Sequence, residues 1–192
     1  MIPVGYNAKF IAKPESWLGR ATVEEILSVS ECISESPIDH TVHWLCSAWL
    51  LYDTIGRLES ALARTDVDDA DKLRRFFHEA YPPTILDGHW GSIEGAPTGA
   101  VHPTAGFLLK GYDVVCFATG VAPECSPLSC NSGAKQYGVN RPCLLDSLEN
   151  ALAVVRLIDS DGGYEPGPYG IMSVWEEAAD KSIQTDAASP RR

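Results

Sequence analysis

The sequence contains no long hydrophobic run and no segment that resembles a secretion signal. Its most apolar stretch runs from Trp44 to Tyr52, includes Ser47, and is far shorter than the roughly 20 residues needed to cross a bilayer. The first residues, from Met1 to Asn7, lack the basic start and the apolar core of a signal peptide. We therefore expect no contact with membranes and a cytoplasmic location.

The sequence also lacks an excess of positive charge. It has 15 lysine and arginine residues against 26 aspartate and glutamate residues, which gives a formal net charge of −11 and a pI near 4.8. Because contacts to phosphates need a basic surface, this balance argues against nucleic acid as a partner. The acidic residues are spread along the chain rather than gathered in one tail, so the charge favours a basic protein as the partner.

Complete motifs for nucleotide binding or hydrolysis are missing as well. The glycines Gly88, Gly91 and Gly95 have no P-loop lysine beside them, and the chain has no G-x-S-x-G sequence. His40 and His43 form an H-x-x-H pair that lacks the glutamate of a zinc protease. We therefore expect no cofactor and favour a binding protein over an enzyme.

What the sequence does contain is typical of a globular protein. Hydrophobic residues make up 45% of the chain and charged residues 21%. Alternation and apolar runs predict strands over 6–13, 25–30, 112–118 and 169–175, with weaker candidates at 75–81 (a strand or a helix end) and 139–145. Helical spacing predicts helices over 54–63 and 148–158. Together these elements predict an α+β fold with a mainly antiparallel sheet and two main helices on one face.

Local signals refine these elements. Asp53 is expected to cap the first helix and Asp146 the second, where Glu149 completes a capping box. The strand over 112–118 is apolar on both faces, which predicts a central place in the sheet. The chain then divides into an N-terminal half (1–81), an irregular Pro/Gly-rich connection (82–110), a C-terminal half (111–177) and a disordered tail (178–192). The two halves can form one domain.

The two halves share an order of features that suggests an internal duplication. The sequence Gly5-Tyr6-Asn7 opens the first half, and Gly111-Tyr112-Asp113 opens the second. The segment 30–34 around Cys32 resembles the segment 128–132 around Cys130. Superposing Asp53 on Asp146 keeps the apolar helix positions in phase, and the strands near 76–78 and 171–173 close the halves. This pattern predicts two related β-β-α-β halves in one sheet.

Two of the six cysteines lie in a distinctive loop, at Cys125 and Cys130. With Cys143 and a histidine such as His89 or His102 they could bind zinc, although structural zinc sites prefer closely spaced cysteine pairs. The favoured interpretation is that these thiols are small buried side chains in a turn.

The same loop allows a second chemical interpretation. Cys125 or Cys130 could act as a nucleophile, with His89 or His102 as the base and Asn131 or Ser132 donating to an oxyanion. No sequence signature of a cysteine hydrolase accompanies these residues. The alternative function is therefore a small cysteine-dependent or zinc-binding enzyme.

Candidate binding residues are the exposed aromatic and acidic groups of the loops. Trp90 is a candidate anchor, and Asp66, Asp68 and Asp69 are candidates for contact with a basic partner. We read the Asp66–Asp71 run as an acidic helix start, and Ser129 and Asn131 as turn-shaping residues that a partner can also reach. The favoured function is an acidic binding protein, in its most concrete form an immunity-type inhibitor that masks a basic toxin such as a nuclease.

Overall fold

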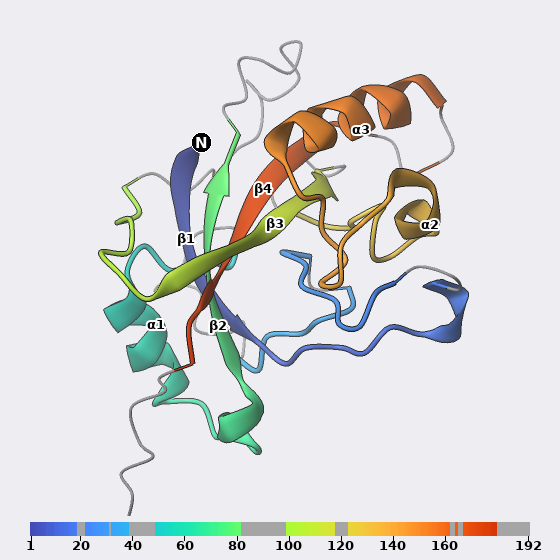
Figure 1. The fold of residues 1–192 in the computed structure, drawn as a ribbon. Helices are drawn as coiled ribbons and strands as arrows, with labels where there is room; N and C mark the ends of the chain where they lie inside the picture. The colour runs from blue at the N-terminus through green and yellow to red at the C-terminus, as the bar shows by residue number, and fades with distance from the viewer. Residues whose placement is uncertain are drawn as a thin grey trace, which may run out of the picture.

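A four-stranded antiparallel sheet organises the chain in the computed structural model (Figure 1). The structure describes residues 1–18, 22–30, 32–38, 49–81, 99–117, 123–161, 164 and 167–179. The strands are β1 (Ile2–Lys9), β2 (Arg74–Ala80), β3 (Phe107–Cys116) and β4 (Tyr169–Glu177), in the order β1-β2-β4-β3. The helices are α1 (Ile55–Leu62), α2 (Gly133–Tyr137) and α3 (Leu148–Asp161), with short 3-10 turns η1 (Ser16–Leu18) and η3 (Ala70–Lys72). The predicted α+β class is confirmed.

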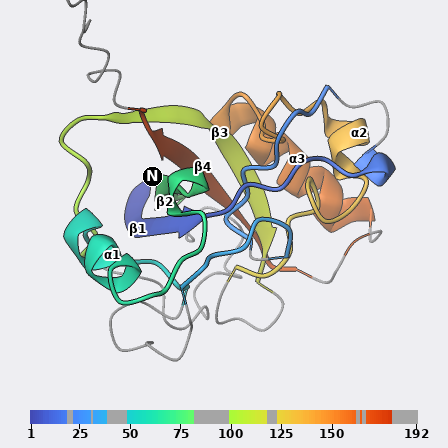
Figure 2. The ribbon, with the colours of Figure 1, turned by 90° about the horizontal axis from the view of Figure 1, so that it is seen from below.

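The two main helices, α1 and α3, pack on the same face of this sheet. Leu58 of α1 lies in a buried cluster with Phe77 of β2, and Val155 of α3 lies in another with Ile171 of β4. Phe77 pairs with Trp175, which lies on the same face of β4 as Ile171 because strand side chains alternate. Figure 2 shows α1 and α3 at opposite ends of the sheet. The predicted arrangement of two helices on one face is confirmed.

Irregular segments cover the opposite face of the sheet. Phe76, Met172 and Val174 point to this side and pack against buried side chains from outside the strands, among them Leu27, Val29, Trp49, Leu51 and Leu144. Both faces of the sheet are therefore buried. The strand β3 lies at the edge of the sheet, so the predicted central position of the 112–118 strand is wrong. Its sequence is apolar on both faces because both faces of the sheet are covered.

Several predicted strand boundaries are also wrong. β1 starts four residues before Tyr6, and Pro3 is tolerated there because β1 is an edge strand. The segment 25–30 forms no strand beyond a single bridge from Ile26 to Ala12, and within 139–145 only Leu145 makes a bridge. Residues 107–110, expected to be irregular, open β3. The candidate at 75–81 is the strand β2.

Hydroxyl side chains, not aspartates, accept hydrogen bonds at the start of both main helices. Thr54 is the N-cap of α1 and accepts from the amide of Arg57 at 3.3 Å. Ser147 precedes α3 and accepts from the amide of Asn150 at 3.1 Å. The expected cap at Asp53 and the expected cap at Asp146 are thus each displaced by one residue. Among the described residues, neither main helix nor any other is long and apolar enough to cross a membrane.

The two halves have equivalent backbone features. Gly5 in β1 and Gly111 in β3 both lie at a register shift, and both have positive φ angles, of +136° and +147°. The residue after each glycine makes a paired backbone bridge, Tyr6 with Tyr52 and Tyr112 with Leu145. Each of these bridges leads directly into a main helix. The sheet register is therefore similar in the two halves. The predicted β-β-α-β order is wrong, because the segments 25–30 and 139–145 form single bridges instead of strands and each half has one strand before its main helix and one after it.

Positive φ angles and strand pairing extend this equivalence. Leu50 and Cys143, each two residues before its bridge, have φ angles of +59° and +64°. His78 faces Gly5, Val174 faces Gly111, and His78 and Val174 face each other. The register thus has an approximate two-fold axis at the His78–Val174 pair. This axis is perpendicular to the sheet. A rotation about it exchanges the two halves without exchanging the two faces, so α1 and α3 lie on the same face.

Candidate functional site

Three cysteine side chains meet beside the sheet, between two segments that lie far apart in the sequence. Cys32 is exposed, and Cys125 and Cys130 are partly buried. The sulfur atoms of Cys32 and Cys125 are 3.2 Å apart, and all three sulfur atoms lie within 4.8 Å of one another. We call Cys32, Cys125 and Cys130 the thiol cluster. The 3.2 Å separation is longer than the roughly 2.05 Å of a disulfide bond.

A buried carboxylate holds both segments of the thiol cluster in place. Asp113 of β3 accepts hydrogen bonds from the Ser28 hydroxyl at 2.6 Å, the Val29 amide at 3.1 Å and the Ser126 hydroxyl at 2.6 Å. Its side chain is buried, and burial raises its pKa against the opposing effects of these donors and of Lys9. Asp113 thereby joins the segment before Cys32 to the loop of the other two cysteines.

A buried cation supports the first of these segments from β1. The amino group of Lys9 donates to the carbonyl oxygens of Ser28, Val29 and Ser30 at 3.0, 2.8 and 2.8 Å. Lys9 is only 1% exposed, so these carbonyl groups replace water around its charge. The course of the chain toward Cys32 is therefore fixed by charge-assisted hydrogen bonds of both Lys9 and Asp113 to the segment 28–30.

Burial sets the proton affinity of the thiols. Burial raises the pKa of Cys130, and the neighbouring Cys32 adds to this effect. Burial also raises the pKa of Cys143, to about 12, with contributions from Asp113 and Cys130. A raised pKa keeps the Cys130 thiol protonated at neutral pH, so this side chain is a poor resting nucleophile.

The structure brings together some of the residues of the predicted zinc set and separates others. Cys125 and Cys130 are in the thiol cluster, whereas the sulfur of Cys143 is buried and donates to the carbonyl oxygen of Leu128 at 3.6 Å. His102 lies 3.3 Å from a carboxylate oxygen of Glu79 and packs on Phe77, on the helix-covered face of the sheet. Neither Cys143 nor His102 belongs to the cluster.

Sequence reasoning missed Cys32 as a member of the cluster. The sequence similarity between the segments around Cys32 and Cys130 was a signal that could have grouped these two cysteines. The structure places the two segments in contact, with the Ser30 hydroxyl 3.9 Å from the sulfur of Cys130. Other predicted residues, namely His40, His43, His89, Trp90 and also Cys46, lie outside the described residues.

The predicted polar binding residues have different surroundings. Asp66, Asp68 and Asp69 are exposed on the connection between α1 and β2. Asp69 pairs with Lys72 at 2.8 Å and precedes the short turn η3, so the expected acidic helix start is a single 3-10 turn. Asn131 is partly exposed beside the thiol cluster, whereas Ser129 is 1% exposed and its hydroxyl lies 3.9 Å from the sulfur of Cys130.

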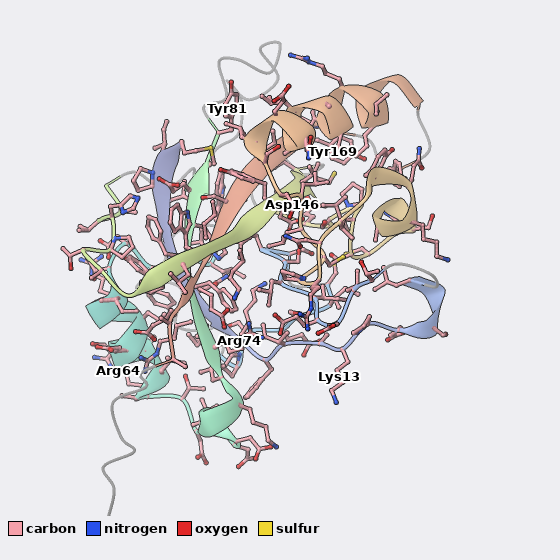
Figure 3. All side chains as sticks on the ribbon, in the orientation of Figure 1. Lys13, Arg64, Arg74, Tyr81, Asp146 and Tyr169 are labelled. Atoms are coloured by element: carbon pink, nitrogen blue, oxygen red, sulfur yellow. The ribbon has the colours of Figure 1, made fainter. Side chains whose placement is uncertain are left out.

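Carboxylates hold many of the cations on the described surface. Arg74 is the centre of one such network, bound to Glu25 and Glu176, and Lys110 also binds Glu176 at 2.9 Å. Further ion pairs join Arg57 to Asp53, Arg75 to Glu59 and Glu177, and Arg141 to Glu24. In Figure 3 Arg74 projects from the start of β2, whereas Lys13 extends away from the fold. These ion pairs neutralise the positive charges of the cations, and the unpaired carboxylates that remain give the surface its net negative charge.

His78 gives the fold a predicted dependence on pH. Burial lowers the pKa of His78 to about 3, with the Lys9 charge acting in the same direction and the Ser173 carbonyl opposing it. Its ring nitrogens lie 3.2 Å from the Ser173 carbonyl and 3.0 Å from the Asn7 side-chain oxygen, and a neutral ring donates to one of them. In the unfolded chain His78 has a pKa near 6.5 and is protonated below that pH, whereas in the folded state it stays neutral until the pH approaches 3.

Stability from His78 is therefore complete above pH 6.5 and falls as the pH drops toward 3. We expect this residue to lower the free energy of unfolding by about 2 kcal/mol between pH 6.5 and 5. Urea denaturation at pH 7, 6 and 5 measures the effect, which should be lost in His78→Gln and kept in the exposed-site control His102→Gln. Equal pH dependence in wild type and His78→Gln would contradict the assignment.

No protein-family model matches the chain, and searches of curated proteins and of solved structures found no match.

Proposed function

We propose that this protein is a binding protein for a basic partner protein, and that its specific form is an immunity-type inhibitor that covers the active site of a cationic toxin such as a nuclease. The observation that carries the proposal is the charge of the surface. The chain has a net charge of −11, and carboxylates hold many of the described cations in ion pairs. A partner approaching from solvent therefore meets a negative field.

A negative field of this kind suits a binding protein more than an enzyme with an anionic substrate. Complementary charge accelerates the encounter of two proteins and suppresses partners of the same sign. The connection between α1 and β2, at the bottom of Figure 1, carries the exposed carboxylates of Asp66, Asp68 and Asp69 close together in sequence. We propose this connection as part of the contact surface. Asn131 is a further candidate, and the buried Ser129 is left out of the surface.

The test begins with affinity capture at 50 mM and 500 mM salt, followed by purification of the captured protein and calorimetry of the pair. We expect a cationic partner, and we expect the triple variant Asp66→Asn/Asp68→Asn/Asp69→Asn to raise Kd by about tenfold or more. Asparagine is the right replacement at position 69, because Asp69 has a φ angle of +60° that asparagine adopts readily.

The control removes the same number of charges elsewhere on the surface. Glu15→Gln/Glu35→Gln/Glu149→Gln changes three exposed carboxylates on other segments and should change Kd by less than about threefold. Equal losses in the two triple variants would reject the proposed contact surface. An acidic partner, or affinity that does not respond to salt, would reject the proposed function itself.

The alternative function, a cysteine-dependent or zinc-binding enzyme at Cys125 and Cys130, also has a specific observation in its favour. The structure adds Cys32 to these two cysteines in one thiol cluster. A nucleophilic mechanism would need a base beside the cluster, and the candidate His102 lies elsewhere, against Glu79 and Phe77. The metal-binding form of the alternative is thus the one that the geometry favours.

A further inference from the structure

We propose that Cys32, Cys125 and Cys130 bind one Zn²⁺ ion as three thiolate ligands, with the fourth coordination position open to solvent. This inference is independent of the proposed binding of a basic partner. It depends on the convergence of three sulfur atoms from two segments that are about 100 residues apart in the chain, as the Ser30–Cys130 contact shows.

The spacing of the sulfur atoms suits a zinc ion. With Zn–S bonds of about 2.3 Å at tetrahedral angles, two sulfur ligands lie about 3.8 Å apart. In the thiol cluster the sulfur atoms of Cys32 and Cys125 are 3.2 Å apart, and all three lie within 4.8 Å of one another. Shifts of less than about 1 Å in side-chain position therefore bring all three separations to the tetrahedral value.

The backbone on both sides of the cluster is held by buried charges before any metal binds. Asp113 connects Ser28 and Val29 to Ser126, and Lys9 holds the carbonyl groups from Ser28 to Ser30. These contacts lie two to four residues from Cys32 and one residue from Cys125. A site with its ligands already placed loses less conformational entropy when the ion binds.

Neighbouring polar groups fit the role of supporting a metal-bound thiolate. The Ser129 hydroxyl lies 3.9 Å from the sulfur of Cys130, within reach of a weak O–H···S contact. The Ser30 hydroxyl lies at the same distance from this sulfur and donates its proton to the carbonyl oxygen of Glu124. The amide of Cys32 donates to the Ser30 hydroxyl at 3.2 Å, which ties two ligand positions to one hydroxyl group. Partners of this kind around the ligands orient them and tune the metal.

The binding step balances as a ligand exchange without any redox change. Each coordinating thiol releases one proton to solvent, so three protons leave as three Zn–S bonds form. A hexa-aqua zinc ion loses five waters and keeps one, which gives a site with a net charge of −1. Because Cys32 is exposed, the remaining water faces solvent, where a small ligand can replace it.

The test adds zinc to purified, fully reduced protein under nitrogen and measures bound metal after gel filtration. We expect one zinc ion per chain and an apparent Kd of about 0.1 µM or tighter in competition with a chromophoric chelator. Cobalt(II) as a spectroscopic substitute should give the visible bands of a tetrahedral site and a thiolate charge-transfer band in the near ultraviolet.

Single variants distinguish this ligand set from the one that the sequence predicts. Cys32→Ser, at an exposed position, should weaken zinc binding by about 100-fold, because it removes one of three thiolates. Cys143→Ala and His102→Ala remove side chains outside the cluster and should leave zinc binding within about threefold of wild type. Circular dichroism checks that each variant is folded, and His102→Ala serves as the control if Cys143→Ala unfolds.

Two results would overturn the proposal. One is full zinc binding in Cys32→Ser, which would show that the sulfur of Cys32 is not a ligand. The other is reduced wild-type protein that takes up less than half an equivalent of zinc under these conditions, whether or not Cys32 and Cys125 were joined in a disulfide before reduction. Either result leaves the salt-dependent partner test unaffected, so the two proposals fail separately.

Discussion

Replacing Asp113 by alanine is expected to lower the free energy of unfolding by about 3–5 kcal/mol. The carboxylate is 1% exposed and accepts three hydrogen bonds, from the Ser28 and Ser126 hydroxyls and the Val29 amide. Its removal leaves these donors buried without an acceptor, and each such donor costs about 1–3 kcal/mol. It also removes the opposite charge from the neighbourhood of the buried Lys9.

Urea denaturation of purified variants at pH 7 measures this effect, and Asp146→Ala is the matched control. Asp146 is exposed, and it accepts a single hydrogen bond from the Asn140 side chain at 3.1 Å. We expect the control to cost less than about 1 kcal/mol. If Asp113→Ala costs no more than Asp146→Ala, the carboxylate does not join the two segments as described.

Asp113→Asn separates the role of the charge from the role of the shape. The asparagine side chain keeps the volume of aspartate and one acceptor oxygen, but its amide nitrogen cannot accept a hydrogen bond. We therefore expect a cost between those of the alanine variant and the wild type, about 1–3 kcal/mol. A cost equal to that of Asp113→Ala would show that the charge dominates the contribution.

The main helices could be predicted from the sequence because the information for them is local. Apolar residues at helical spacing place Leu58 and Val155 toward the sheet, and both are buried in the structure. The cap residues were misplaced by one position, because Asp53 and Thr54 are both good acceptors and the backbone decides which of them occupies the N-cap.

The strands were harder to predict, because burial depends on tertiary cover rather than on strand position. An apolar run such as Val114–Cys116 reads as a central strand, yet β3 lies at the sheet edge under α3 on one face and loop residues on the other. Leu27 and Val29 alternate like a strand, but neither pairs with a neighbouring strand. The backbone of Val29 is held by Lys9 and Asp113, and the amide of Leu27 donates to the carbonyl oxygen of Pro142.

The candidate site was predicted in part for the same reason. Cys125 and Cys130 share a loop and could be grouped from the sequence, whereas Cys32 joins them only through a contact between distant segments. The burial of Lys9 and Asp113 could not be predicted from the sequence, because charged residues are almost always exposed unless the fold supplies partners for them. The sequence similarity around Cys32 and Cys130 was the one pattern that connected the distant segments.

The equivalence of the two halves leads to the second large expected effect: Gly5→Ala and Gly111→Ala should each lower the free energy of unfolding by about 3 kcal/mol. Both glycines have φ angles that L side chains rarely adopt, +136° and +147°. An added Cβ would lie 2.6 Å from the carbonyl oxygen of Tyr52 in the first half and 2.7 Å from that of Leu145 in the second.

A backbone oxygen cannot move aside as a flexible side chain can, so the bridge that leads into each main helix has to distort. The control Gly56→Ala lies in α1 with nothing within 4 Å of the added Cβ, and should be neutral or stabilising by up to about 1 kcal/mol. Urea denaturation of the three variants tests the equivalence of the halves directly. Because the two glycines occupy matching positions, their costs should agree within about 1 kcal/mol, and a large cost at only one of them would show that the two bridges differ in their contribution to stability.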